Sequence, residues 1–167
     1  PAPTARPDTT TGGAGQTQTT NLLTNTAGSD SVAPGYGASL NAASVKLCDP
    51  TTNPAEVAPD CTKTSVTVPG VGTYSVSATG VMTFVPEEGF TGTPEELSYT
   101  VADNYGVKAT STYTPTVVPG PDANPDTTTG GQDVNQSINL LTNTDGKDTA
   151  ADGATLNAAS VKLCAVA

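Results

Sequence analysis

Residues 72–86 read GTYSVSATGVMTFVP, and this stretch decides the fold class. It holds two runs in which apolar and polar side chains alternate, separated by Ala-Thr-Gly. Tyr74 and Val76 share one face of the first run, and Met82 and Phe84 share one face of the second. Alternation with a period of two is typical of half-buried strands. We therefore predict two antiparallel strands and a tight hairpin, although the Asp-Gly or Asn-Gly pair common in such turns is missing.

The same pattern extends outward in both directions. It predicts strands that cover residues 16–23, 40–48, 61–68, 72–77, 81–85, 97–103 and 107–117. Another hairpin is predicted at residues 103–106 (DNYG), because Asn and Gly tolerate positive φ. Phe90 follows a turn at residues 86–89 and is placed to close one end of the core. The inward faces of the outer strands are predicted to carry Val45, Leu47, Val66, Val68, Leu97, Tyr99, Val101, Val107, Ala109, Ser111 and Tyr113.

The composition agrees with an all-β fold. Thr and Val favour strands, whereas Gly, Pro, Asn and Asp favour turns, and these residue types dominate the chain. Disorder is the alternative for so polar a composition, but the regular apolar alternation argues against it. About seven strands in roughly 110 residues, with polar outer faces, predict an immunoglobulin-like β-sandwich. Its small core would draw its bulk from Tyr74, Phe84, Phe90, Tyr99 and Tyr113.

The chain repeats itself over a long interval. Three blocks return: PDTTTGG of residues 7–13 at 125–131, NLLTNT of residues 21–26 at 139–144, and LNAASVKLC of residues 40–48 at 156–164. The first two return 118 residues later (125 − 7), and the third returns 116 residues later (156 − 40). A period of this length is the size of a whole domain and is too long for a solenoid unit.

We therefore expect tandem repeats of one domain. Residues 1–118 would be a complete repeat, residues 119–124 a proline-rich joint, and residues 125–167 the N-terminal part of a second, truncated repeat. Prolines favour an extended, semi-rigid joint. The chain opens without a signal peptide, on a mature-looking Pro1, so we expect a segment of a longer secreted protein whose sorting signals lie outside it.

The charge balance excludes several classes of partner. Lys and Arg number 6 and Asp and Glu number 16, which gives a net charge of −10. Such a chain is not drawn to nucleic acid or to an anionic membrane surface. No stretch approaches the ~20 apolar residues that a membrane helix needs, so no membrane insertion is predicted.

Cysteine usage indicates an oxidising compartment. Cys48 ends one predicted strand and Cys61 opens the next, so the two suit a disulfide that staples a hairpin. Such a bond fits an extracellular setting, and a pair of free buried thiols is the alternative. Cys164 matches Cys48 and would be unpaired by truncation. No Cys-x-x-Cys motif occurs, so no metal site is predicted.

The residues for most catalytic chemistry are missing. Histidine is absent, which removes the Ser-His-Asp and Cys-His arrangements and most catalytic zinc sites. The glutamate pairs Glu87-Glu88 and Glu95-Glu96 are better explained as solvated loop charges than as a catalytic pair. We predict no catalytic residues and no cofactor, and hence no enzyme.

Two further chemistries are considered and not favoured. Residues 143–148 (NTDGKD) resemble an oxygen-rich calcium loop, but one of the acidic positions aligns with Ala27 in the first copy. A cross-link of Lys46 with Asp103 or Asn104 could lock the sandwich. Alternation places Lys46 on the outer face, opposite Val45 and Leu47, which favours a solvated lysine instead.

An ordered set of motifs resembles the CshA-type fibril repeat. The set comprises NPDTTTG at residues 124–130, GTYSV at 72–76, GVMTFVP at 80–86, GFTGT at 89–93, SYTVAD at 98–103 and ATSTYTPTV at 109–117. The resemblance covers residues 7–118 and the start of the next copy. It implies a bacterial wall-anchored fibril of many tandem β-sandwich repeats, mainly a stalk that projects an adhesive tip. The cysteines depart from the family pattern.

These observations predict a structural stalk repeat of a bacterial cell-surface fibril or adhesin, secreted to the cell surface or wall. Its partners would be neighbouring repeats of the same chain. One alternative is a binding module for a host matrix protein or glycan. Tyr36 and Tyr105 are its loop aromatics, but Tyr36 lies in a stretch that is shorter in the second copy. Another alternative is a filament subunit that pairs strands with a neighbouring copy.

Overall fold

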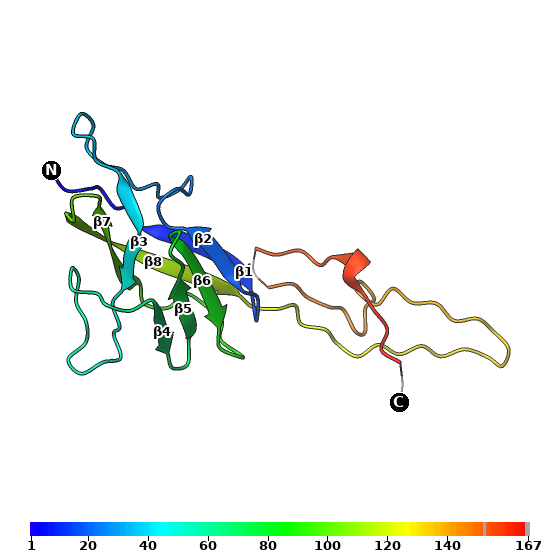
Figure 1. Ribbon diagram of the computed structural model, residues 1–167. Helices are drawn as coiled ribbons and strands as arrows, with labels where there is room; N and C mark the ends of the chain where they lie inside the picture. Colours follow the sequence, from blue (N-terminus) through cyan, green and yellow to red (C-terminus); the bar gives the residue numbers. More distant parts are fainter. Residues whose placement is uncertain (152, 166–167) are drawn as a thin grey trace. The chain divides into compact units, whose positions relative to one another are not determined.

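The computed structural model describes residues 1–151 and 153–165, and it divides into two compact units, Pro1–Val118 and Pro119–Ala167. Figure 1 shows the strands of the described residues in the first unit. The described part of the second unit consists of turns and extended segments with one short 3-10 turn, η1 (Ala158–Ser160).

The first unit is a sandwich of two four-stranded sheets. One sheet has the order β1 (Asp8–Gly13), β8 (Lys108–Val118), β7 (Leu97–Asp103), β3 (Leu40–Leu47). The other has the order β2 (Gln18–Asn21), β6 (Val81–Pro86), β5 (Gly72–Val76), β4 (Ser65–Val68). β1 pairs with β8 in parallel, and the other pairings are antiparallel. The prediction of an all-β, immunoglobulin-like sandwich is confirmed.

The core lies between the two sheets, where the alternating side chains point. Its buried members are Leu22, Leu23, Val45, Leu47, Val66, Tyr74, Val76, Met82, Phe84, Leu97, Tyr99, Val101, Tyr113 and Val117. The Tyr74 ring packs against Phe84 at a centroid distance of 4.8 Å and meets the edge of Tyr113 at 6.1 Å. The predicted inward faces are therefore correct for most positions. Val68, Ala109 and Phe90 pack against this core while partly buried.

The structure corrects four details of the sequence prediction. It contains an eighth strand, β1, which the alternation missed. The strand predicted over residues 61–68 begins only at Ser65, and Cys61 lies in the connection before it. The strand predicted over residues 16–23 is limited to β2. Val107, predicted to point inward, is 41% exposed, because it lies in the β7–β8 turn before β8 begins at Lys108; its N–H bonds to Asp103 Oδ1 at 2.9 Å.

A bulge in β3 shapes its contact with β7. Asn41 pairs with Ala102 and Lys46 pairs with Thr100, so the four residues between Asn41 and Lys46 lie opposite a single residue of β7. The Ser44 side chain fills the interrupted ladder: its Oγ accepts from the Ala102 N–H at 2.7 Å and donates to the Asn41 carbonyl at 2.6 Å. A bulge makes such local substitution of backbone bonds necessary.

Candidate functional site

A buried polar cluster ties the start of the first unit to its central strand. The Tyr99 hydroxyl of β7 donates to Asp8 Oδ2 at 2.8 Å and lies 3.4 Å from Asp30 Oδ2. The Arg6 N–H donates to Asp30 Oδ1 at 2.8 Å, and Asn25 Nδ2 donates to Asp8 Oδ1 at 2.5 Å. Asp8 is 1% exposed and Asp30 is 6% exposed. The cluster therefore joins the N-terminal segment, β1, the loop after β2 and β7.

Burial controls the protonation of this cluster. It is the main cause that raises the pKa of Asp30 to about 6, and the neighbouring Asp8 carboxylate raises it further, against the Arg6 N–H hydrogen bond. Burial also raises the pKa of Asp8, although hydrogen bonds from Tyr99 and Asn25 oppose it. The pKa of Tyr99 is well above its usual range, first because of burial and then because of the two carboxylates. Tyr99 therefore keeps its single proton and donates it chiefly to Asp8 Oδ2 at 2.8 Å, with Asp30 Oδ2 farther away at 3.4 Å.

The hydrogen bonds of this cluster recur in the second unit without the tyrosine. The counterparts run from Asn143 Nδ2 to Asp126 Oδ1, from Asn124 N–H to Asp148 Oδ1 at 2.8 Å, and from Gly146 N–H to Asn143 Oδ1 at 2.6 Å. The backbone bridge between Thr4 and Ser31 likewise recurs between Asp122 and Thr149. The sequence repeat is thus also a repeat of local structure, formed by the N-terminal blocks alone.

Gly28 packs tightly against the cluster. Its N–H donates to Asn25 Oδ1 at 2.6 Å, and a Cβ at this position would lie 2.6 Å from the Pro7 carbonyl oxygen and 2.7 Å from Asp8 Oδ1. Gly146 is in the same situation against Pro125 and Asp126. A side chain at Gly28 would have to displace the Pro7 backbone and the buried Asp8 carboxylate.

We therefore expect Gly28→Ala to lower the free energy of unfolding of the first unit by about 1–3 kcal/mol, as other overpacked sites do. Urea denaturation followed by circular dichroism measures the change. Gly120→Ala is the matched control, because no atom lies within 4 Å of its Cβ position. An unchanged midpoint for Gly28→Ala would show that the turn shifts without cost.

The disulfide closes a loop between the two sheets. Cys48 follows β3 and forms a disulfide with Cys61, and both residues are buried. Within the loop, Glu56 Oε2 accepts from the Asp49 N–H at 3.0 Å, and the Thr62 hydroxyl donates to Glu56 Oε1. The Thr62 hydrogen bond is the main cause that lowers the pKa of Glu56. The loop is therefore held at its base by a covalent bond and by a charged acceptor.

Cys164 is the counterpart of Cys48 in the second unit. It is exposed and has no disulfide partner among residues 1–151 and 153–165. A lone exposed thiol does not by itself indicate a functional site.

Tyr36 and Tyr105 form the exposed aromatic pair of the first unit. They are 64% and 65% exposed, and the Tyr105 hydroxyl donates to the Tyr36 carbonyl at 3.1 Å. They line a shallow pocket of about 270 Å³ together with Pro1, Ala33, Ala38, Asp103 and Val107. This is the place where sequence reasoning expected a ligand-binding module to present its aromatic side chains.

Other residues considered from the sequence have structural partners. The glutamates of both pairs are exposed, and Glu87 Oε2 accepts from the Gly70 N–H at 2.8 Å. Asn143 and Asp148 direct their oxygens at backbone N–H groups. Asp103 Oδ1 accepts from the N–H groups of the β7–β8 turn, and Asn104 Oδ1 accepts from the Ser39 N–H. Within the described residues, no group of three His, Cys, Asp or Glu side chains is arranged to hold a metal ion.

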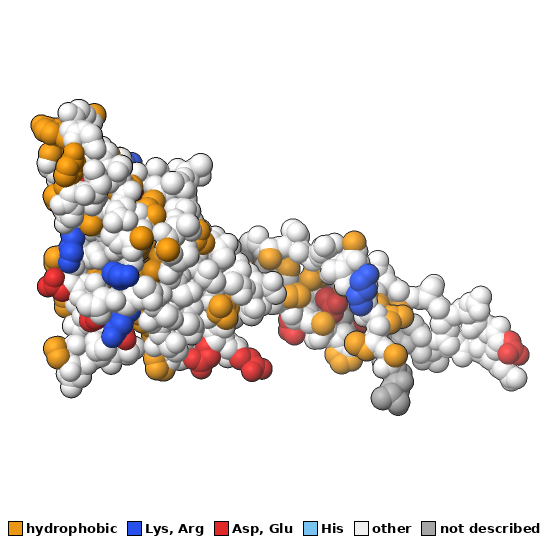
Figure 2. Space-filling view, in the orientation of Figure 1, with side chains coloured by type: hydrophobic (Ala, Val, Ile, Leu, Met, Phe, Trp, Pro, Cys, Tyr) orange, Lys and Arg blue, Asp and Glu red, His pale blue; other side chains and the backbone are white. Residues whose placement is uncertain are grey.

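The surface carries its charge in small groups. Figure 2 shows Lys, Arg, Asp and Glu side chains scattered over the face in view, among backbone and other side chains. In the part of the chain that the structure describes, no helix has the length and apolar character that crossing a bilayer requires.

Comparison with known proteins gives one match. A family model described as the surface adhesin CshA repetitive domain matches residues 1–117. The matched range is most of the chain and nearly all of the first unit. No curated protein and no solved structure matches the chain.

Proposed function

The chain belongs to the family of surface adhesin CshA repetitive domains, and from this premise we propose that it is a stalk repeat of a bacterial fibril. Membership makes it a secreted component of the cell surface, in a family that is not a class of enzymes. In this proposal the chain catalyses no reaction. Residues 1–118 are one complete repeat, residues 119–124 are the joint, and residues 125–167 begin the next repeat.

The recurrence of the N-terminal hydrogen bonds is the observation that carries this proposal. The backbone bridge between residues 4 and 31 and the hydrogen bond from Asn25 to Asp8 both recur 118 residues later in the second unit. A chain that repeats a whole domain adds reach with each copy. The joint between the copies contains Pro119 and Pro121, which favour an extended link.

The strand order of the first unit also suits a stalk. The first and last strands, β1 and β8, pair in parallel from Asp8 with Tyr113 to Gly13 with Val118. The N-terminus and the end of β8 lie at opposite ends of this unit (Figure 1). A pull between the two ends of the unit therefore acts along both strands in opposite directions. It loads their ladder of hydrogen bonds in shear, so that the bonds must break together.

Small-angle X-ray scattering tests the stalk role. We expect chains of one, two and three complete repeats to show a maximum dimension that grows by a constant step, because each repeat adds a rigid unit and a short joint. Intact mass before and after reduction should give one disulfide per repeat. A compact or flexible particle for three repeats would contradict the proposal.

A binding module is the second candidate, and the exposed pair of Tyr36 and Tyr105 favours it. Paired aromatic side chains around a shallow pocket suit contact with a glycan or a protein loop. The stretch that holds Tyr36 is two residues shorter in the second copy and has no tyrosine there. A binding surface of this kind would thus belong to particular repeats, and the stalk role would be shared by all of them.

A further inference from the structure

The joint that follows the first unit is held at both of its ends. On the upstream side, the Ala14 N–H donates to the Val118 carbonyl at 2.9 Å and so holds the last residue of β8. On the downstream side, Asp122 and Thr149 exchange two backbone hydrogen bonds, at 2.9 and 3.0 Å. Residues 119–121 are exposed and make no backbone–backbone hydrogen bond to any residue that the structure describes. The unattached part of the joint is therefore three residues long.

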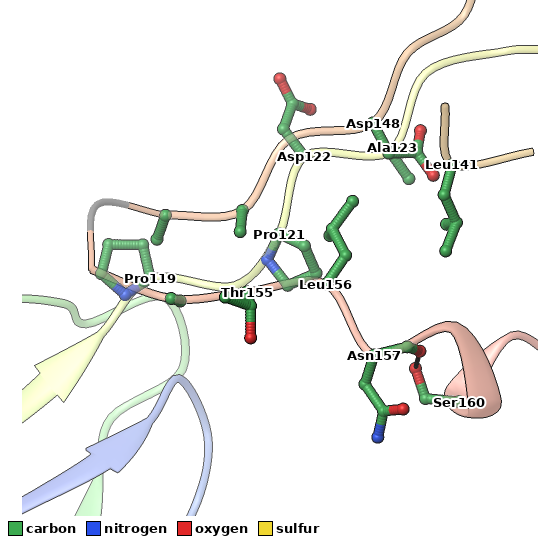
Figure 3. Close-up of a pocket in the computed structure, with 13 residues that line it drawn as sticks. Pro119, Pro121, Asp122, Ala123, Leu141, Asp148, Thr155, Leu156, Asn157 and Ser160 are labelled. Carbon is green, nitrogen blue, oxygen red and sulfur yellow. Dashed lines mark hydrogen bonds between the residues drawn. The ribbon is translucent and has the colours of Figure 1, made fainter. Parts of the chain in front are cut away.

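Residues 122–124, the rest of the joint, are bound to the second unit. The Asn124 N–H donates to Asp148 Oδ1 at 2.8 Å, and the Asn124 side-chain amide donates to the Lys147 carbonyl at 2.9 Å. Figure 3 shows Ala123 next to Asp148. We call this bonded set the clasp; it consists of residues 122–124 and their partners Lys147, Asp148 and Thr149.

The first unit has the same clasp at its own N-terminal segment. Thr4 and Ser31 exchange two backbone hydrogen bonds, at 2.8 and 3.0 Å, and the Arg6 N–H donates to Asp30 Oδ1 at 2.8 Å. These residues precede those of the second clasp by 118 positions, and the residue types differ at several of them. What the two clasps share is the backbone bonding and one aspartate. Because the first unit is a complete sandwich, the clasp is a property of the fold.

The three unattached residues contain one freely rotating φ angle. The rings of Pro119 and Pro121 fix φ at about −65°, and each proline also restricts the residue before it to extended conformations. Gly120 is therefore the one residue of the three whose φ is not fixed, and without a Cβ it can adopt φ of either sign. The corresponding residue of the first copy is Ala2, whose Cβ confines φ to negative values.

We propose that the joint of the stalk is a hinge at the single residue Gly120, bounded by β8 on one side and by the clasp on the other. The inference rests on the proposed function, because it takes the second unit as the start of the next repeat. The three unattached residues span at most about 14 Å between the Cα atoms of Val118 and Asp122. Bending of the stalk would be concentrated at one residue, and a joint with alanine there, as in the first copy, would be stiffer.

The clasp is tested on the 167-residue chain by 15N relaxation, which gives an order parameter for each backbone N–H. We expect order parameters of about 0.85 for Asp122 and Asn124 and below about 0.6 for Gly120. Asp148→Ala removes the acceptor of the Asn124 N–H and should lower the values of Asp122 and Asn124 toward that of Gly120. The matched control is Asp145→Ala, which removes the same charge from an exposed side chain outside the clasp and should leave these values unchanged.

Gly120→Ala tests the hinge itself. No atom lies within 4 Å of the Cβ position of Gly120, so the substitution leaves both units folded. Residual dipolar couplings in a dilute aligned medium give a degree of order for each unit, and we expect the second unit to be less ordered than the first. In Gly120→Ala the ratio of the two values should move toward one, and the order parameter of residue 120 should rise. Should Asp148→Ala unfold the second unit, the wild-type relaxation profile and Gly120→Ala decide the question alone.

Two results would overturn the inference. One is a low order parameter at Asp122 and Asn124 in the wild-type chain, which would make the whole of residues 119–124 flexible. The other is a ratio of the two degrees of order that Gly120→Ala does not change. Either result together with a constant step in scattering would reject the hinge and leave the stalk role standing. A compact particle of three repeats with an ordered clasp would reject the stalk role instead.

Discussion

Replacing Cys48 and Cys61 together with alanine is expected to lower the free energy of unfolding of the first unit by about 3 kcal/mol. The disulfide joins residues 13 positions apart, and the estimate is the chain entropy that such a closed loop removes from the unfolded state. Alanine is the appropriate replacement because both sulfur atoms belong to buried residues, where a serine hydroxyl would add the cost of an unpaired polar group.

Urea denaturation in a Cys164→Ala background measures this effect, because no thiol other than the pair under study is then present. Reduction of that background protein should produce the same loss as the double replacement. Cys164→Ala alone should leave stability unchanged, since Cys164 is exposed and unpaired among the described residues. A loss below about 1 kcal/mol would mean that the Glu56 hydrogen bonds to Asp49 and Thr62 already restrain the loop in the reduced chain.

The block LNAASVKLC shows how far sequence determines structure in this protein. Residues 40–47 form β3 in the first unit, whereas the identical residues of the second unit contain the 3-10 turn Ala158–Ser160 and no strand among those described. The Ser44 hydroxyl and its counterpart Ser160 both donate to the backbone carbonyl three residues earlier, at 2.6 Å. The local bond thus follows from the sequence, and the strand requires β7 beside it.

The strands that could be predicted are those with alternating apolar side chains. β5, β6 and β7 place Tyr74, Phe84 and Tyr99 in the core because each of these strands has one apolar face. β1 could not be predicted in this way, since DTTTGG has no apolar residue and becomes a strand through its parallel pairing with β8. The signal that could have revealed β1 is its return as PDTTTGG in the second copy.

The buried acids were missed for a different reason. Asp8 and Asp30 read as surface charges in the sequence, because buried carboxylates are rare unless they have partners. Their partners are Tyr99, the Arg6 backbone and Asn25, which lie far away in the sequence or in the backbone itself. Only the folded chain brings these groups together. The disulfide, by contrast, joins two residues whose spacing in the sequence already favoured pairing.

Asp30→Asn is expected to stabilise the first unit near pH 7.5, by up to about 3 kcal/mol, and to have little effect near pH 4. Burial raises the pKa of Asp30 from 3.8 to about 6 in the folded protein, so between these values the folded state binds more protons than the unfolded state. Stability must therefore fall as pH rises through this window, and the loss is complete above pH 6. Asparagine keeps the acceptor for the Arg6 N–H and removes the charge beside Asp8.

Urea denaturation at pH 4.5, 6.0 and 7.5 separates this effect from the general relief of repulsion that acidification gives a chain of net charge −10. Asp30→Asn should flatten the pH dependence between 4.5 and 7.5. The matched control is Asp148→Asn, because Asp148 accepts the equivalent backbone bond from Asn124 but, among the described residues, has no hydrogen bond from a tyrosine. If the free energy of unfolding had the same pH dependence in the wild-type chain and in Asp30→Asn, the charge of Asp30 would not be what destabilises the folded state at high pH. The buried carboxylates would then hold β1 to β7 as hydrogen-bond acceptors alone.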